Sequence, residues 1–167
     1  MKKHLVLAFL VVIVINLRGQ GLAKMQSAYI YHFTKYMQWP SAKQSGDFVI
    51  AVVGSSEIYE HLQNMAAIKK AGVQNIIIKK FGSVAAVSDC HMIFLSASKS
   101  YQLGSAIGKG KQFHALIVTE KNGYGKRGAG INFVIIEGKP KFEVNESSIN
   151  QNGIKVSAKF VQLGIKV

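Results

Sequence analysis

Histidine and cysteine have the most versatile side-chain chemistry in this sequence, and their spacing limits what they could do. Four histidines follow the first twenty residues, and they fall in separate segments without the close pairs that bind metals: His32, His61, His91 and His114. Cys90 is the only cysteine, so an internal disulfide is excluded. It is next to His91, but neighbouring side chains of a strand point to opposite faces and cannot work together as nucleophile and base. The apolar residues that follow predict a buried, unreactive thiol.

A glycine-rich segment offers a second kind of chemistry. Residues 123–128 read Gly-Tyr-Gly-Lys-Arg-Gly and match the dinucleotide fingerprint G-x-G-x-x-G. That mechanism needs the loop to open a helix whose N-terminus faces the pyrophosphate. Here an apolar run from Ile131 predicts a strand instead, so we interpret the segment as a flexible loop. The eight Asp and Glu residues also include no close pair in a motif typical of acid–base catalysis. We therefore predict that the protein is not an enzyme and uses no cofactor or metal.

The remaining candidates for a binding site are polar residues in and around a predicted hairpin. Asn132, Lys141, Glu143 and Asn145 have apolar neighbours in two segments, 131–136 and 141–145, that read as antiparallel strands. We expect some of them to gather on one sheet face, where a charged Lys–Glu pair and amides could hold a polar ligand or a partner. The alternative is an ordinary solvated face. Trp39, where the first predicted helix ends before Pro40, is a further candidate as a large partner-binding anchor.

These residues are positioned by alternating strands and helices. Apolar runs predict strands at 48–53, 76–78, 92–95, 115–119 and 131–136, and helical periodicity predicts helices at 25–39, 57–67, 100–107 and from 149 to the C-terminus. The alternation predicts a three-layer α/β/α sandwich with a mostly parallel sheet and a C-terminal antiparallel hairpin. With 167 residues, 49% of them hydrophobic, one domain is expected.

The first residues have the pattern of a secretory signal. Lys2 and Lys3 precede an apolar run over residues 5–15, and Gly21 and Ala23 supply the small residues of a cleavage site. We predict a signal peptide over residues 1–23, a single domain over 24–167, and a periplasmic location. The alternative, a retained anchor, has fewer apolar residues than the roughly 20 that span a bilayer. The net charge is +13, or +10 without residues 1–23, and we interpret it first as an ordinary solvated, lysine-rich surface. The alternative is attraction to an anionic envelope surface or an acidic partner, whereas an exported protein is not expected to bind nucleic acid.

Several segments together resemble the YfiR family of periplasmic proteins. They occur in order over nearly all of residues 26–163, behind the predicted signal peptide: residues 28–36 with Trp39 and Pro40, 90–96, 128–134, 141–145 and 155–160. The resemblance implies a YfiR-like domain that acts as a regulatory binding protein. The best-known member is a periplasmic repressor that binds the sensor region of an inner-membrane diguanylate cyclase and so restrains cyclic-di-GMP synthesis and biofilm formation.

The implied partner of this chain is the periplasmic region of an inner-membrane diguanylate cyclase or sensor kinase. The best-known member also dimerises and is linked to redox state through disulfides, so a homodimer is part of what the resemblance implies. Cys90 fits the family's Cys-His position but has no second cysteine to pair with, so disulfide-based redox sensing is not expected here. The alternative function is a periplasmic small-ligand binding protein, with the hairpin face as its pocket.

Overall fold

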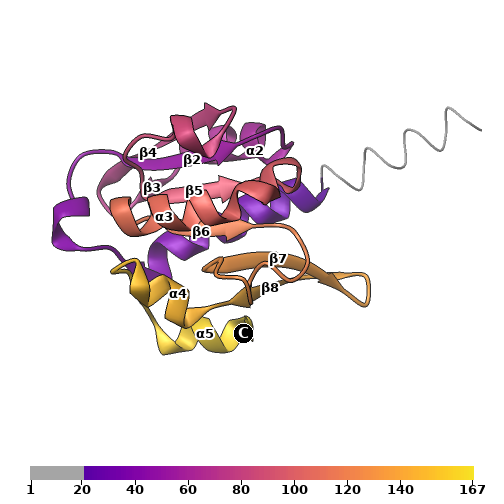
Figure 1. The fold of residues 1–167 in the computed structure, drawn as a ribbon. Coiled ribbons are helices and arrows are strands. Elements are labelled where there is room, and N and C mark those ends of the chain that lie inside the picture. The colour runs from indigo at the N-terminus through magenta and orange to yellow at the C-terminus, as the bar shows by residue number, and fades with distance from the viewer. Residues whose placement is uncertain (1–20) are drawn as a thin grey trace, which may run out of the picture.

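Residues 21–167 of the chain are described by a computed structural model, so residues 1–20, most of the predicted signal peptide, lie outside the described residues. An eight-stranded sheet with the order β10-β8-β7-β6-β5-β2-β4-β3 forms the middle layer (Figure 1). A second, two-stranded sheet pairs β1 with β9. The strands are β1 (Met37–Gln38), β2 (Phe48–Val53), β3 (Lys70–Ala71), β4 (Gln74–Phe81), β5 (Met92–Leu95), β6 (Leu116–Thr119), β7 (Ile131–Ile136), β8 (Lys139–Val144), β9 (Lys155–Val156) and β10 (Ile165–Lys166).

Helices cover both faces of the large sheet. They comprise residues 21–36, α2 (Ile58–Ala66), α3 (Leu103–Phe113), α4 (Glu146–Gln151) and α5 (Ala158–Leu163), with short 3₁₀ helices η1 (Ser41–Lys43), η2 (Val84–Ala86) and η3 (Ala97–Gln102). Strands β4, β2, β5, β6 and β7 run parallel, and β8 returns antiparallel to β7. The predicted three-layer α/β/α sandwich with a C-terminal hairpin is confirmed. Along residues 21–167, no helix combines the length and the apolar character that crossing a membrane requires.

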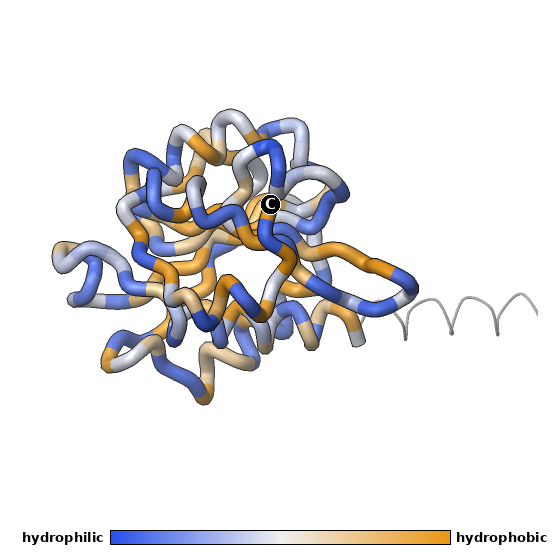
Figure 2. Tube along the Cα trace, turned by 90° about the horizontal axis from the view of Figure 1, so that it is seen from below, coloured by the Kyte–Doolittle hydropathy of each residue, from blue (hydrophilic) through white to orange (hydrophobic). Residues whose placement is uncertain are grey.

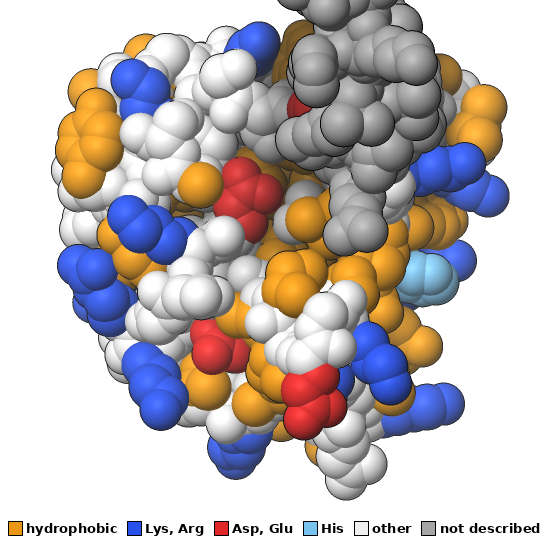
Figure 3. All heavy atoms as spheres, turned by 90° about the vertical axis from the view of Figure 1, so that its right-hand side faces the viewer, with side chains coloured by type: hydrophobic (Ala, Val, Ile, Leu, Met, Phe, Trp, Pro, Cys, Tyr) orange, Lys and Arg blue, Asp and Glu red, His pale blue; other side chains and the backbone are white. Residues whose placement is uncertain are grey.

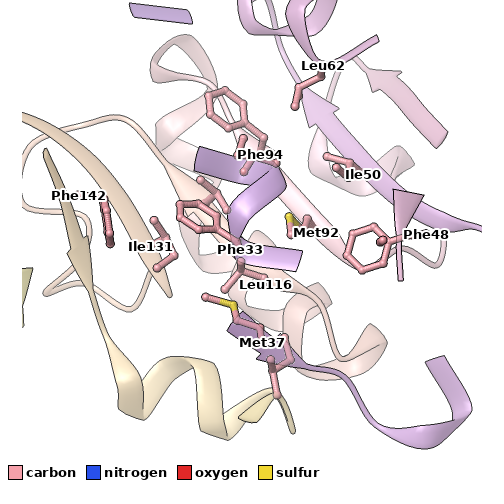
Figure 4. Packing of buried hydrophobic residues seen from close by; sticks show 14 of the residues in the cluster. Phe33, Met37, Phe48, Ile50, Leu62, Met92, Phe94, Leu116, Ile131 and Phe142 are labelled. Atoms are coloured by element: carbon pink, nitrogen blue, oxygen red, sulfur yellow. The ribbon is translucent and has the colours of Figure 1, made fainter. Parts of the chain in front are cut away.

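The central strands are apolar on both faces because each face has its own helical layer. In β5, Met92 and Phe94 pack into the larger core, against Phe33 of the first helix and Leu62 of α2 (Figure 4). The alternate residues of the same strand pack into the second core, beneath α3. A parallel strand buried on two sides needs such an unbroken apolar run, which is why the sequence predicted these strands well.

Other predicted elements were wrong in their bounds. The first helix ends at residue 36 and is followed by β1, and β4 is longer than the predicted strand at 76–78. Predicted helix 100–107 is instead η3 followed by α3, which runs on through the glycines at 108 and 110. The predicted single C-terminal helix is α4, β9, α5 and β10. Ser157 begins α5 separately, because its side chain accepts a hydrogen bond from the backbone N–H of Phe160 over 3.2 Å.

The β7–β8 hairpin extends beyond the other strands, with a hydrophobic arm and a hydrophilic arm (Figure 2). Its turn consists of Glu137 and Gly138, both with positive φ, 52° and 71°. Such two-residue turns match the right-handed twist of the strands they join. Pro140 lies within β8 opposite Ile135. Because this position is not one that hydrogen-bonds to β7, the missing N–H of the proline costs the ladder nothing.

Candidate functional site

Three polar side chains form a row across neighbouring strands. Thr119 of β6 is opposite Asn132 of β7, which is opposite Glu143 of β8. The Thr119 hydroxyl donates a hydrogen bond to Asn132 Oδ1 over 2.7 Å, and Asn132 Nδ2 donates to Glu143 Oε2 over 2.8 Å. Thr119 and Asn132 are fully buried. Their hydrogen bonds satisfy polar atoms that would otherwise be costly to bury, so the row fixes the hairpin to the sheet.

The glycine-rich loop, residues 120–130, lies over this row. A Cβ on Gly125 would come within 2.6 Å of Glu143 Oε2, so only glycine fits there without displacing the carboxylate. Asn145 Nδ2 donates to the carbonyl of Gly125 over 2.9 Å, and Asn145 Oδ1 accepts from the N–H of Ser148 at the start of α4. The structure therefore brings Asn132, Glu143 and Asn145 together, as expected, and places them beneath a loop that they hold.

Lys141 lies apart from that row. It is exposed, and it borders a cavity of about 170 Å³ at the end of the molecule where the hairpin leaves the sheet. The first helix, the segment after β6 and both arms of the hairpin line this cavity: Leu22, Gln26, Glu120, Asn122, Phe133, Val134, Ile135, Pro140 and Lys141. Figure 3 looks onto this end, where apolar side chains lie at the surface between charged ones.

One edge of β7 is open beside this cavity. β6 ends at Thr119 and pairs with β7 only as far as Asn132, whereas β8 pairs with all of β7. Within residues 21–167, no strand therefore pairs with residues 133–136 on the β6 side. Ile135 and Ile136 are 52% and 38% exposed, and β7 contains no charged residue. This open edge was not predicted from the sequence, because it depends on where β6 ends.

The turn of the hairpin decides which backbone groups face outward. The two residues that flank a two-residue turn form a hydrogen-bonded pair, so the backbone groups of Ile136 face Lys139 of β8. In an antiparallel ladder the next residue along the strand, and every second one after it, directs its backbone N–H and C=O away from the partner strand. Ile131 follows this alternation, because its carbonyl accepts a hydrogen bond from the Thr119 hydroxyl on the β6 side over 3.5 Å. The backbone N–H and C=O of Ile135 therefore face the open edge.

Glu120 places a half-buried carboxylate in the cavity wall. Its Oε1 accepts a hydrogen bond from the N–H of Ala97 over 3.1 Å, and its Oε2 accepts one from Gln26 Nε2 over 3.5 Å. Burial raises the pKa of Glu120 above its ordinary value, and these two hydrogen bonds oppose the rise. In the part of the chain that the structure describes, Glu120 forms no ion pair, so the acid is held by neutral donors alone.

Trp39 and His91 are part of the core rather than the surface. Trp39 is 6% exposed, its Nε1 donates to the carbonyl of His91 over 3.1 Å, and its ring packs edge-on against Phe48. Trp39 also borders a second cavity of about 300 Å³. His91 packs on the same side, whereas Cys90 faces the opposite core, as the alternation of a strand predicted. Burial raises the pKa of the Cys90 thiol to about 12, so it stays protonated.

The four described histidines lie in or beside different elements: the first helix, α2, β5 and α3. Among residues 21–167, no three His, Cys, Asp or Glu side chains come together where they could hold a metal ion. The glycine-rich loop is followed by strand β7, so it does not open a helix as a dinucleotide site requires. Its Gly125 carbonyl instead accepts a hydrogen bond from the side chain of Asn145.

Comparison with known proteins identifies the chain at the level of a family. The family model described as YfiR/HmsC-like matches residues 23–165. A comparison with curated proteins finds no match. Because the family match covers nearly all of the described fold, including the hairpin and the glycine-rich loop, the chain belongs to the YfiR/HmsC-like family of periplasmic regulatory proteins.

Proposed function

We propose that this protein is exported, loses residues 1–23, and binds the periplasmic region of an inner-membrane signalling protein, a diguanylate cyclase or a sensor kinase. In this role it acts by protein–protein contact rather than by catalysis, and it restrains cyclic-di-GMP signalling. Membership of the YfiR/HmsC-like family supports a regulatory role. Cleavage removes Lys2, Lys3 and Arg18 and lowers the net charge from +13 to +10, which still supports a partner or envelope surface of opposite charge.

The observation that carries the proposal is the open, uncharged edge of β7 beside a small cavity. Apolar side chains exposed together, as Ile135 and Ile136 are, often mark interaction sites. The cavity measures about 170 Å³, below the roughly 300–1,000 Å³ typical of small-molecule pockets. With Leu22 in its wall, the cavity has room for one side chain of a protein partner rather than for a separate ligand.

We assign different roles to the predicted binding residues. Lys141 is the direct contact, because it is exposed at the cavity rim. Asn132, Glu143 and Asn145 act indirectly, since their hydrogen bonds fix the hairpin and its covering loop. Trp39 stabilises the fold from the core and does not contact the partner at the hairpin. The cavity that Trp39 borders is separate from the cavity at the hairpin.

Signal-peptide cleavage would alter this site directly. Leu22 lines the cavity and the neighbouring Ala23 is buried, so cleavage after Ala23 would take Leu22 from the cavity wall. The mature chain would then begin at Lys24 and leave the cavity more open. Export and readiness to bind are therefore linked in this proposal.

Crosslinked capture from the native envelope tests the binding proposal. Tagged full-length protein is crosslinked in intact cells, and the captured membrane proteins are quantified by mass spectrometry. We expect one cyclase or sensor kinase to be enriched, and Lys141→Glu to reduce its recovery at least tenfold. Lys111→Glu on α3 is the matched control, since it changes the net charge equally at an exposed site on another element. Equal recovery with both variants would contradict the assignment of Lys141, and no enrichment with confirmed export would contradict the proposal.

A small-ligand function is the second candidate, and an aromatic cavity favours it. Residues of the first helix, the hairpin and α5 enclose about 290 Å³: Tyr29, His32, Tyr36, Phe142, Phe160 and Leu163. A ligand that binds the native state raises the melting temperature by mass action. A thermal-shift screen of small aromatic compounds tests this candidate. A saturable rise that Phe160→Ala reduces would support it, and no rise at millimolar concentration would exclude the compounds screened.

A further inference from the structure

We infer that the partner adds an extended segment of its own chain to the open edge of β7, as an additional strand of the large sheet. This inference rests on the proposed function and specifies how the partner is held. Strand addition uses the backbone hydrogen bonds of an exposed sheet edge for affinity and pockets for alternate side chains for specificity. The end of the molecule at the hairpin provides both features.

The first feature is a set of outward-facing backbone groups. β8 pairs with β7 along its whole length, but β6 stops at Thr119, so Ile135 presents its N–H and C=O without a neighbouring strand among residues 21–167. The hairpin is fixed at its base by the hydrogen bonds of Asn132. An incoming strand would therefore meet an edge that is already in its extended conformation, which lowers the entropic cost of binding.

The second feature is the absence of the charges that usually protect an edge. Lysine on an edge strand discourages pairing with other chains, and the outer edge of β4 carries Lys79 and Lys80. The two-residue strand β10 at the opposite end of the sheet carries Lys166. β7 has neither lysine nor glutamate. Among these three free edges of the large sheet, the edge of β7 is the one that lacks this protection, which points to a use for it.

The chemistry around the edge indicates the kind of segment that binds. The cavity adjoins Ile135, so alternate side chains of an added strand can enter it. The apolar residues that still line it after cleavage, Phe133, Val134 and Pro140, suit an aliphatic group. Lys139 and Lys141 are exposed on β8, one strand away. Glu120 and Glu137 lie near these lysines, but the excess of 21 Lys and Arg over 8 Asp and Glu leaves the whole chain positive, which favours an acidic segment. The segment is therefore extended, with apolar residues alternating with Asp or Glu.

Removing a single N–H tests strand addition. Ile135→Pro deletes the outward-facing donor at a position that does not hydrogen-bond to β8, whereas Ile135→Val keeps the N–H and a similar side chain. Both variants are produced as full-length exported protein, and envelope capture is repeated with the crosslinking protocol described above. We expect Ile135→Val to recover the wild-type amount of the same membrane protein and Ile135→Pro to recover at least tenfold less, with melting temperatures within a few degrees of wild type.

A second measurement covers the case in which Ile135→Pro does not fold. The periplasmic part of the captured protein is purified, and amide hydrogen exchange of residues 131–137 is compared between the free wild-type protein and the complex. Strand addition predicts at least tenfold slower exchange at the outward-facing amide of Ile135. Capture without that slowing, or equal capture by the proline and valine variants, would overturn strand addition while leaving the proposed function intact. Capture of only a second copy of this chain would overturn the inferred partner, and capture of nothing would overturn the proposed function itself.

Discussion

Asn132 donates a hydrogen bond to Glu143 across the β7–β8 ladder, and the two atoms, Nδ2 and Oε2, are 2.8 Å apart. The amide oxygen of the same side chain accepts from Thr119 on the other side. Asparagine is suited to this place because it can donate to an acceptor on one strand and accept from a donor on the next. The hairpin is thereby fixed to β6 at the last position where the two strands meet.

We predict that Asn132→Asp destabilises the protein by about 3 kcal/mol at pH 7, because it removes the buried donor and places two carboxylates side by side. Urea unfolding at pH 7 measures this loss. Asn150→Asp on the exposed side of α4 is the control and should change stability by less than about 0.5 kcal/mol. A comparable loss in both variants would contradict this role of Asn132.

His91 makes the stability of the protein depend on pH. Its Nδ1 accepts a hydrogen bond from the N–H of Val49 over 3.1 Å, and its Nε2 lies 2.8 Å from the carbonyl of Lys43, an arrangement that requires the neutral ring. Burial lowers the pKa of His91 below its ordinary value of 6.5. Between pH 6.5 and the lowered pKa, the unfolded chain therefore binds a proton that the folded protein does not bind.

We predict that this contribution to the free energy of unfolding is complete above pH 6.5 and decreases as the pH falls toward the lowered pKa, by at most about 1.4 kcal/mol per pH unit. Urea unfolding between pH 8 and pH 5 measures the slope. His91→Gln should flatten it in this range, and His32→Gln, at an exposed position, should leave it unchanged. An unchanged slope in the His91 variant would show that other groups cause the dependence.

Cys90 is expected to be chemically silent in the folded protein. It is 1% exposed, so reagents cannot reach its sulfur atom. Burial also raises the pKa of its thiol to about 12, so the reactive thiolate does not form. A thiol-reactive dye should label the native protein negligibly within an hour and label it fully in denaturing urea. The melting temperature should be the same with and without reductant. Fast labelling of the native protein, or a shift with reductant, would contradict the absence of a redox role.

The mature protein is expected to begin at Lys24. Mass spectrometry of the protein recovered from the periplasmic fraction measures its N-terminus directly. A substitution of Ala23 by a bulky residue should slow processing, because signal peptidases require small residues at the cleavage site. Recovery of the intact chain, beginning at Met1, from the membrane fraction would instead support a retained anchor.

Much of the fold could be predicted because its strands are buried on both faces. β2 and β5 are apolar along their whole length and β6 is apolar up to Thr119, and such runs are the strongest signal in a sequence. The C-terminal region was harder to predict, because β9 and β10 have two residues each and exist only through pairing with β1 and β8. The glycines of α3 weakened a helical pattern that packing against the sheet restores.

The candidate site could be predicted only in part, because it also depends on contacts between segments that are far apart in the sequence. Alternation along β7 and β8 correctly placed Asn132 and Glu143 on one face. Their burial beneath the loop at Gly125 depends on a tertiary contact that local pattern does not encode. The open edge of β7 depends on where β6 ends, four residues before the end of β7, and no property of β7 itself reveals that.

The level of cyclic-di-GMP in living cells tests the central claim most directly. It should be measured in a strain that lacks this protein and in the same strain supplied with wild type, Lys141→Glu or Lys111→Glu at equal periplasmic abundance. The proposed function predicts a rise of several-fold on deletion, restored to normal by wild type and by Lys111→Glu but not by Lys141→Glu. An unchanged level on deletion, or full restoration by Lys141→Glu, would contradict regulation through this hairpin.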